Sequence, residues 1–247
     1  MIGKGFIRFR DIIERMPPIK SLTKEQLLTE DLLMERIEPL DIYYAPHNEV
    51  IMEHAKLMIV GLTPGFHQMK LALAEAQAAI LEGDSDEQAC MRAKQTARFA
   101  GVMRVNLITM LDQLGIDNWL GLNSCEDLFA QHAYWLNSTS VIPYPAFLHG
   151  RNYTGSQPHL LKHKMLTAYA KLHMHDQLEK VPSIPVIPLG KQVEGLLRLL
   201  VEDQVIDQQR ILWGFPHPSG ANGHRLRQFA EHLPSMSRQV TEWANQS

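Results

Sequence analysis

His217 is the side chain best placed to do chemistry in this sequence. It lies in the stretch RILWGFPHPSGANGH at positions 210–224, between Pro216 and Pro218. An imidazole changes charge near neutral pH, which suits it to acid–base catalysis or to stabilising a developing anion. Proline fixes its own φ angle and restricts the residue before it. We therefore expect the His217 ring to be held in place, as a catalytic or ligand-binding histidine needs to be.

The segments on either side of His217 predict a strand, a loop and a helix. Residues 211–213 form an apolar run that is long enough for a buried strand and too short for a helix, and an apolar-periodic segment begins at Leu226. This order places His217 at the carboxyl end of a strand, where α/β proteins commonly bind ligands. The alternative is a plain turn in which Ser219 or Asn222 only caps the last helix.

A second strand–loop–helix unit lies earlier in the chain. Residues 56–60 read KLMIV and predict a buried strand, GLTPG follows at 61–65, and a helix is expected over 66–82. Glycines in such a turn allow close backbone approach, and the helix start offers unpaired N–H groups. The sequence GLTPG matches neither the phosphate-loop pattern nor the dinucleotide fingerprint.

The remaining pattern predicts an α/β fold around a parallel sheet. Strands and helices alternate, which favours parallel strands joined by right-handed crossovers. We expect the loops that follow the strands, at 61–66, 143–157, 190 and 217–222, to meet at one sheet edge. Strands are predicted at 56–60, 138–142, 184–189 and 211–213, and helices at 22–37, 66–82, 86–98, 102–114, 124–131, 158–179, 191–200 and 226–243, the last broken near Pro234.

Composition limits the protein classes to which the chain can belong. Its 247 residues are 45% hydrophobic, enough for one substantial domain, and we expect neither a membrane span nor a secretory leader. Cys90 and Cys125 are too few for a disulfide framework, a cysteine zinc site or an iron–sulfur cluster, so we expect a cytoplasmic protein without metal or cofactor. The net charge of −3 argues against strong non-specific DNA affinity but allows a local basic groove.

Taken together, the two loops resemble motifs of the uracil-DNA glycosylase superfamily. GLTPG at 61–65 resembles its first motif, HPSGAN at 217–222 resembles its second, and FAG at 99–101 before an amphipathic helix resembles a branch known from thermophilic members. The likeness covers roughly residues 40–232. It implies a three-layer α/β/α fold with a central four-stranded parallel sheet over residues 41–247, and the chain pattern predicts an N-terminal helical extension at 1–40.

The resemblance also implies a function and a set of site residues. Such enzymes flip a nucleotide out of DNA and stabilise the departing base as an anion, so DNA with a flipped-out base is the expected partner of a monomeric protein. The implied catalytic residues are His217, which donates to a base oxygen, and Thr63, which positions water unless an unidentified carboxylate does so. The implied base-binding residues are Gly61, Leu62, Pro64, Gly65, Phe66, Phe99 and Ser140, and the implied DNA-binding residues are Gly190, Pro218, Ser219, Gly220, Ala221 and Asn222.

Three departures from the family pattern motivate a second hypothesis. Thr63 stands where members commonly carry Asp or Asn, and a hydroxyl is no general base. Ser140 stands where an Asn usually hydrogen-bonds the edge of the base. Ala221 stands where a larger side chain usually fills the gap that the flipped-out base leaves in the DNA, and its methyl group is too small for this. The alternative is therefore a glycosylase-fold protein that binds nucleic acid or a nucleotide without cleavage. A third possibility is a different small-molecule hydrolase on the same sheet.

Other polar residues have both a functional and a structural interpretation. His159 and His163 are spaced as metal ligands one helical turn apart, but no third ligand is evident and an exposed helix face is favoured. Arg151 and Tyr153 could bind a phosphate, or they could lie on a loop without contacting a ligand. Lys191 could face an anion or only solvent.

Overall fold

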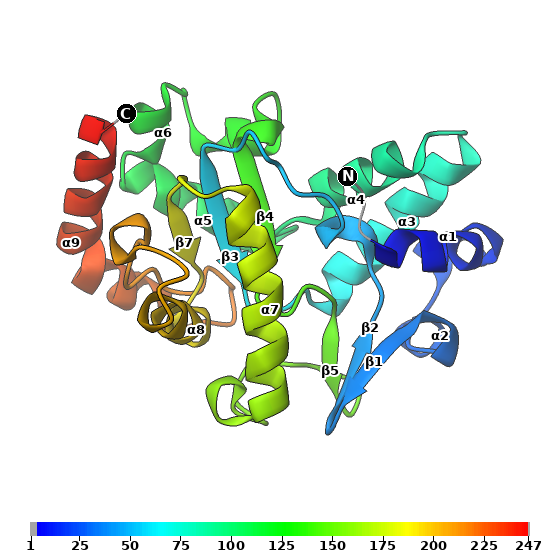
Figure 1. Ribbon diagram of the computed structural model, residues 1–247. Coiled ribbons are helices and arrows are strands. Elements are labelled where there is room, and N and C mark those ends of the chain that lie inside the picture. The colour runs from blue at the N-terminus through cyan, green and yellow to red at the C-terminus, as the bar shows by residue number, and fades with distance from the viewer. Residues whose placement is uncertain (1–3, 247) are drawn as a thin grey trace. The chain divides into compact units, whose positions relative to one another are not determined.

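The computed structural model describes residues 4–246, which form two compact units (Figure 1). Of the described residues, the first unit comprises 4–51, 62–100 and 142–170, and the second comprises 52–61, 101–141 and 171–246. Helix α7 (Lys164–Lys180) contributes to both units. Within the described residues, no helix is long and apolar enough to cross a membrane.

The second unit is built on a parallel sheet of three strands. These are β3 (Leu57–Gly61), β4 (Leu136–Ser140) and β7 (Val186–Pro188), in the order β4-β3-β7, and every residue in them is buried. A strand buried on both faces reads as a continuous apolar run, which is why LMIV could be recognised in the sequence.

The expected fourth strand at 211–213 is wrong, because this segment makes only an isolated bridge to the sheet and no strand. Ile211 makes a single parallel bridge to Val186, and Leu212 N donates to Val186 O at 2.9 Å. Pairing cannot continue along β7 because Pro188 has no N–H to donate. In addition, Gly214 adopts a φ angle of +87° and interrupts the regular pairing, so that the next backbone bond runs from Gly190 N to Phe215 O at 3.0 Å.

Four helices belong wholly to the second unit: α5 (Val102–Gln113), α6 (Ile116–Leu120), α8 (Lys191–Glu202) and α9 (Arg225–Gln246). Helix α9 runs through Pro234, so the break expected there is wrong. The buried side chains of Met236, Val240 and Trp243 follow at helical spacing, and their burial offsets the hydrogen bond that Pro234 cannot make.

The first unit contains an antiparallel sheet that the sequence analysis did not predict. Its order is β1-β2-β5-β6, formed by β1 (Leu33–Ile37), β2 (Leu40–Tyr43), β5 (Ala146–Leu148) and β6 (Arg151–Asn152). The segment 143–157, expected to be a loop, thus supplies two strands. The helix expected over 22–37 is wrong, because only α2 (Lys24–Leu27) is helical and β1 follows it.

Capping and pairing explain that difference. Thr23 and Gln26 form a capping box that starts α2, but the helix ends after one turn. The segment Leu33–Ile37 instead pairs with β2, with Ile37 opposite Leu40. This hairpin crosses residue 40, and the domain boundary expected there stays a prediction.

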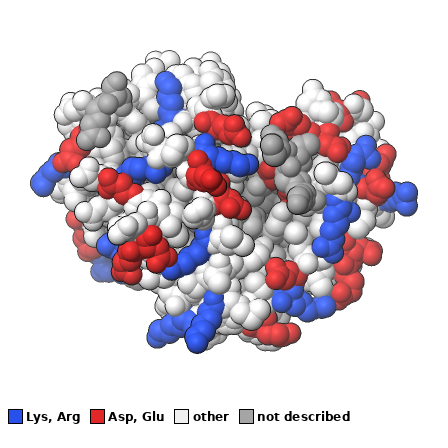
Figure 2. Space-filling view, in the orientation of Figure 1, with Lys and Arg blue, Asp and Glu red and all other residues white. Residues whose placement is uncertain are grey.

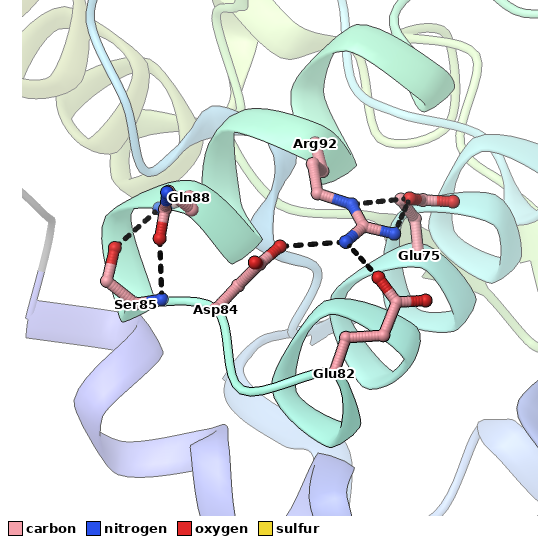
Figure 3. Close-up of polar contacts among 6 residues, drawn as sticks. All are labelled: Glu75, Glu82, Asp84, Ser85, Gln88 and Arg92. Atoms are coloured by element: carbon pink, nitrogen blue, oxygen red, sulfur yellow. Dashed lines mark hydrogen bonds and ion pairs between the residues drawn. The ribbon is translucent and has the colours of Figure 1, made fainter.

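Two helices form a hairpin in the first unit, α3 (Phe66–Leu81) and α4 (Asp86–Ala97). Figure 3 shows how Arg92 of α4 holds the connection between them: its guanidinium contacts Glu75 at 2.8 Å, Glu82 at 2.5 Å and Asp84 at 2.7 Å. Helix α1 (Lys4–Arg15) packs against both α3 and α4.

Charged side chains are mixed on the face shown in Figure 2. Blue Lys and Arg side chains lie among red Asp and Glu side chains there, without a continuous basic stripe. This face therefore does not carry the electrostatic footprint of a tight non-specific nucleic-acid binder.

Candidate functional site

The carboxyl edge of the parallel sheet in the second unit brings together several predicted site residues. Gly61 and Ser140 are register partners at the ends of β3 and β4. Leu189 N donates to Val60 O at 2.9 Å, which places Gly190 at the same edge. A Cβ atom on Gly190 would lie 3.1 Å from the Cβ atom of His217, so the glycine allows close approach. His217 therefore lies beside the strand ends, as the sequence predicted.

The hydrogen bonding of His217 fixes its tautomer. The backbone N–H of Ser219 donates to His217 Nδ1 at 3.2 Å, so Nδ1 must carry a lone pair. In the neutral ring the proton then sits on Nε2. Burial lowers the pKa of His217 below its ordinary value of 6.5, so the ring is neutral at pH 7. His217 is consequently a neutral imidazole with an Nε2–H donor.

The 217–222 loop is anchored by its carbonyl groups. Asn106 Nδ2 of α5 donates to Pro218 O at 2.9 Å, Arg225 Nη1 donates to Ser219 O at 3.1 Å, and Asn222 Nδ2 donates to His217 O at 3.1 Å. The capping role considered for Ser219 is limited to accepting from Ala221 N at 3.2 Å. Its hydroxyl proton and the exposed backbone N–H of Gly220 remain available to a ligand.

The predicted residues Leu62, Thr63, Pro64, Gly65, Phe66 and Phe99 belong to the first unit. There, Thr63 Oγ1 donates its proton to Tyr144 O at 2.8 Å and accepts from Ala146 N at 3.0 Å. Thr63 thus ties the 61–65 loop to the strand β5. A water could bind Thr63 only through the remaining oxygen lone pair, and its role in positioning water stays a prediction.

The start of α3 and the residue Phe99 have structural partners as well. Gly65 N donates to Gln68 Oε1 at 3.1 Å and Phe66 N donates to Asn152 Oδ1 at 3.1 Å, so these two N–H groups are already capped. Phe99 is buried and has a φ angle of +52°, just before α5. Sequence reasoning missed the cap from Asn152 because it lies 86 residues from Phe66.

A cleft of about 650 Å³ opens beside His217 in the second unit. It lies between α8, the 213–217 segment and α9, and its lining includes Lys191, Arg198, Trp213, Gln228 and His232. The sequence left open whether Lys191 faces an anion or only solvent, and it gave no signal that Arg198, Trp213 or His232 would lie near it. Those three come together only through the packing of two helices against the segment.

The other polar residues singled out in the sequence are mainly structural. His159 and His163 flank a 3₁₀ turn rather than sharing a helix face, and His163 Nε2 lies 2.9 Å from Glu38 O. His173 Nε2 lies 3.1 Å from Thr139 Oγ1. Tyr153 is buried and donates to Pro158 O at 2.6 Å. Arg151 is exposed and lines a separate cavity formed by residues 148–157.

Comparison with known proteins identifies a close relative. Models of known protein families give no match to this sequence. A Bacillus subtilis (strain 168) protein that bears the name Uncharacterized protein YoxB is 43% identical over 226 residues, which cover 91% of this chain and 88% of that protein. The chain therefore belongs to the same protein family as Bacillus subtilis YoxB.

Proposed function

We propose that this protein hydrolyses the N-glycosidic bond of uracil, or of another deaminated or damaged base, in DNA. The observation that carries the proposal is the hydrogen bond from Ser219 N–H to His217 Nδ1, which leaves Nε2–H as a donor at the carboxyl edge of the parallel sheet. In this proposal the protein is a cytoplasmic monomer acting in base excision repair, and its fold is the three-layer arrangement of the uracil-DNA glycosylase superfamily.

The chemistry needs a donor of this kind. The oxygen of water adds at C1′ of the sugar, the N-glycosidic bond breaks, and its electron pair leaves with the base as an anion. The proton that the water loses ends on the base, so the products are a sugar with a 1′-hydroxyl group and the free base. A preorganised hydrogen-bond donor aimed at the oxygen that gains charge typically contributes roughly 10²–10³ in rate. The lowered pKa of His217 keeps the ring neutral at pH 7, so that Nδ1 goes on accepting from Ser219.

The loop geometry supports contact with a nucleic-acid backbone. The hydroxyl proton of Ser219 and the exposed backbone N–H of Gly220 can donate to phosphate oxygens, while the bond from Ala221 N to Ser219 Oγ and the bond from Arg225 to Ser219 O hold the loop in shape. Gly61 and Ser140 would contribute to the wall of the base pocket from the sheet edge of the second unit.

A second candidate function is binding of nucleic acid or a nucleotide without cleavage. The observation that favours it is the engagement of Thr63, whose single proton is donated to Tyr144 O. A hydroxyl used in this way activates water poorly. Ser140 and Ala221 also differ from the residue types that read and replace a flipped base in the superfamily.

One assay separates the two functions. Purified protein is incubated with single- and double-stranded oligonucleotides that contain uracil, hypoxanthine or a mismatched base, and free base is quantified alongside binding to the same oligonucleotides. Base release from any substrate supports hydrolysis. Binding without release from the whole panel contradicts hydrolysis and supports the second function, and the absence of both contradicts each of them.

A further inference from the structure

One peptide unit in the 217–222 loop carries the donor that decides the tautomer of His217. The N–H of this unit belongs to Ser219 and donates to His217 Nδ1 at 3.2 Å, and its carbonyl belongs to Pro218. The Pro218–Ser219 peptide is trans, so its N–H and its C=O lie in one plane and point in opposite directions. A group that holds the carbonyl of Pro218 therefore also aims the N–H of Ser219 at the ring.

This peptide unit has one rotation that its own sequence does not fix. The ring of Pro218 holds φ at roughly −65°, whereas the ψ angle of proline leaves the following peptide free to point in either of two directions. Turns of type I and type II differ in this way, and both accept proline before the peptide. A flipped peptide would present the carbonyl of Pro218 to His217 in place of the N–H of Ser219. Because a carbonyl is an acceptor, the flipped form would favour a proton on Nδ1.

Asn106 holds the carbonyl of this peptide from a distant part of the chain. Its Nδ2 group donates to Pro218 O at 2.9 Å, across 112 positions of sequence. Val102 lies one turn earlier on the same face of α5, and its Cγ1 atom is 3.7 Å from the position that a Cβ atom on Gly220 would take. Helix α5 thus contacts the loop at two points, which keeps the amide of Asn106 against the carbonyl.

The other side-chain anchors of the loop act on neighbouring peptides. Asn222 Nδ2 donates to His217 O at 3.1 Å, but that peptide has no N–H because its nitrogen belongs to Pro218. Arg225 Nη1 donates to Ser219 O at 3.1 Å, which belongs to the next peptide along the chain. Neither of these two bonds fixes the direction of the N–H of Ser219.

We propose that Asn106 is a positioning residue that keeps His217 in its Nε2–H tautomer. It acts through the Pro218–Ser219 peptide. The tautomer is a property of the protein alone, and only its effect on base release rests on the proposed function. Asparagine suits this position because its amide nitrogen donates, whereas an aspartate of the same shape offers only acceptors to Pro218 O.

Nitrogen NMR of the histidine rings measures the tautomer directly. The protein is labelled with ¹⁵N in its 12 histidines, and His217→Gln assigns the ring by the loss of its signals. Spectra are recorded at about pH 8, above the ordinary pKa of histidine, and burial lowers the pKa of His217 further, so that its ring is neutral. We expect the wild type to carry the proton on Nε2 and none on Nδ1.

Two substitutions remove the donor, and a third is the matched control. Asn106→Leu keeps the approximate size of the side chain, and Asn106→Asp keeps its shape. Both are expected to lower the ratio of the Nε2–H to the Nδ1–H tautomer by about threefold or more, since a typical hydrogen bond is worth a factor of this size. Thr109→Val removes a hydroxyl that donates to Val105 O at 3.0 Å within α5, and it is expected to leave the ratio unchanged.

Base release gives a second readout that separates this inference from the proposed function. Asn106→Leu is expected to lower kcat in proportion to its loss of the Nε2–H form, with KM unchanged, because fewer molecules present the donor. Absence of base release by the wild type contradicts the proposed function, whereas the tautomer ratio still tests the role of Asn106.

Three results would each overturn the inference. The first is a proton on Nδ1 of His217 in the wild type, which tests the inference without any substitution. The second is a wild-type tautomer ratio in Asn106→Leu and Asn106→Asp, whose folding is checked by circular dichroism. The third is an equally large change of the ratio in Thr109→Val.

Discussion

Replacing His47 with leucine is expected to stabilise the protein and to reduce its sensitivity to acid. His47 is 3% exposed, and neither of its ring nitrogens has a hydrogen-bond partner in the described part of the chain. Burial, and then the nearby charge of Lys94, lowers the pKa of His47 from 6.5 to about 3. The folded protein therefore keeps this ring neutral where the unfolded chain takes up a proton.

The size of the effect follows from the two pKa values. Between pH 6.5 and pH 3 the unfolded chain binds one more proton at His47, so stability falls as the pH falls, by about 1.4 kcal/mol per pH unit. Lowering the pH from 7 to 5 thus costs about 2 kcal/mol through this residue. His47→Leu removes that loss, and at pH 7 it also removes two unpaired buried nitrogens, which we expect to be worth about 1–2 kcal/mol.

Urea denaturation at pH 7 and pH 5 measures both effects. The wild type, His47→Leu and His67→Leu are compared, His67 being an exposed histidine of α3. We expect His47→Leu to lose about 2 kcal/mol less than the wild type on acidification, and His67→Leu to behave like the wild type. Equal acid dependence of the wild type and His47→Leu, or a strong destabilisation by His47→Leu at pH 7, would refute this reasoning.

Three further substitutions test contacts described above. Arg92→Ala should lower the melting temperature in thermal denaturation, and the difference should shrink in about 1 M salt because the network is solvent-accessible; a salt-independent difference would contradict this. Thr63→Val should cost about 1–3 kcal/mol in urea denaturation, since Tyr144 O loses a donor, whereas Thr63→Ser should cost much less. Gly214→Ala should destabilise by more than about 1 kcal/mol through its φ angle of +87° and its clash with His232. Adding His232→Ala should recover only the part of that loss due to the clash, and full recovery would show that the backbone angle costs nothing.

The parallel sheet and its helices were largely predictable because their signals are local. The strand expected at 56–60 is found at 57–61, and the helix expected at 66–82 is found at 66–81. A continuous apolar run that ends in glycine gives a clear strand end, and the periodic segment after it gives a clear helix.

The antiparallel sheet was missed because its strands are short and its pairing is long-range. Ile42 of β2 pairs with Ala146 of β5, 104 positions later in the chain, and β6 has only two residues. The leucines between residues 22 and 33 are spaced like a helix face, which hid the turn between α2 and β1. Tertiary pairing overrode local preference there.

The candidate site was predictable in position but not in detail. The two prolines around His217 indicated a held ring at a strand end, and the structure places it beside Gly190. The bond from Ser219 N to Nδ1, which decides the tautomer, depends on backbone angles that no residue type specifies. The cleft could not be predicted from residue types either, because its lining comes together only when α8 and α9 pack against the 213–217 segment.

The most direct test of the account is the single-turnover rate of base release by the wild type, His217→Ala and His224→Ala. His224 is an exposed histidine in the same loop region and serves as the matched control. The account predicts base release by the wild type, a loss of about 100-fold or more in His217→Ala, and an unchanged rate in His224→Ala. Release that is equally fast in His217→Ala and the wild type would contradict the role assigned to the Nε2–H donor.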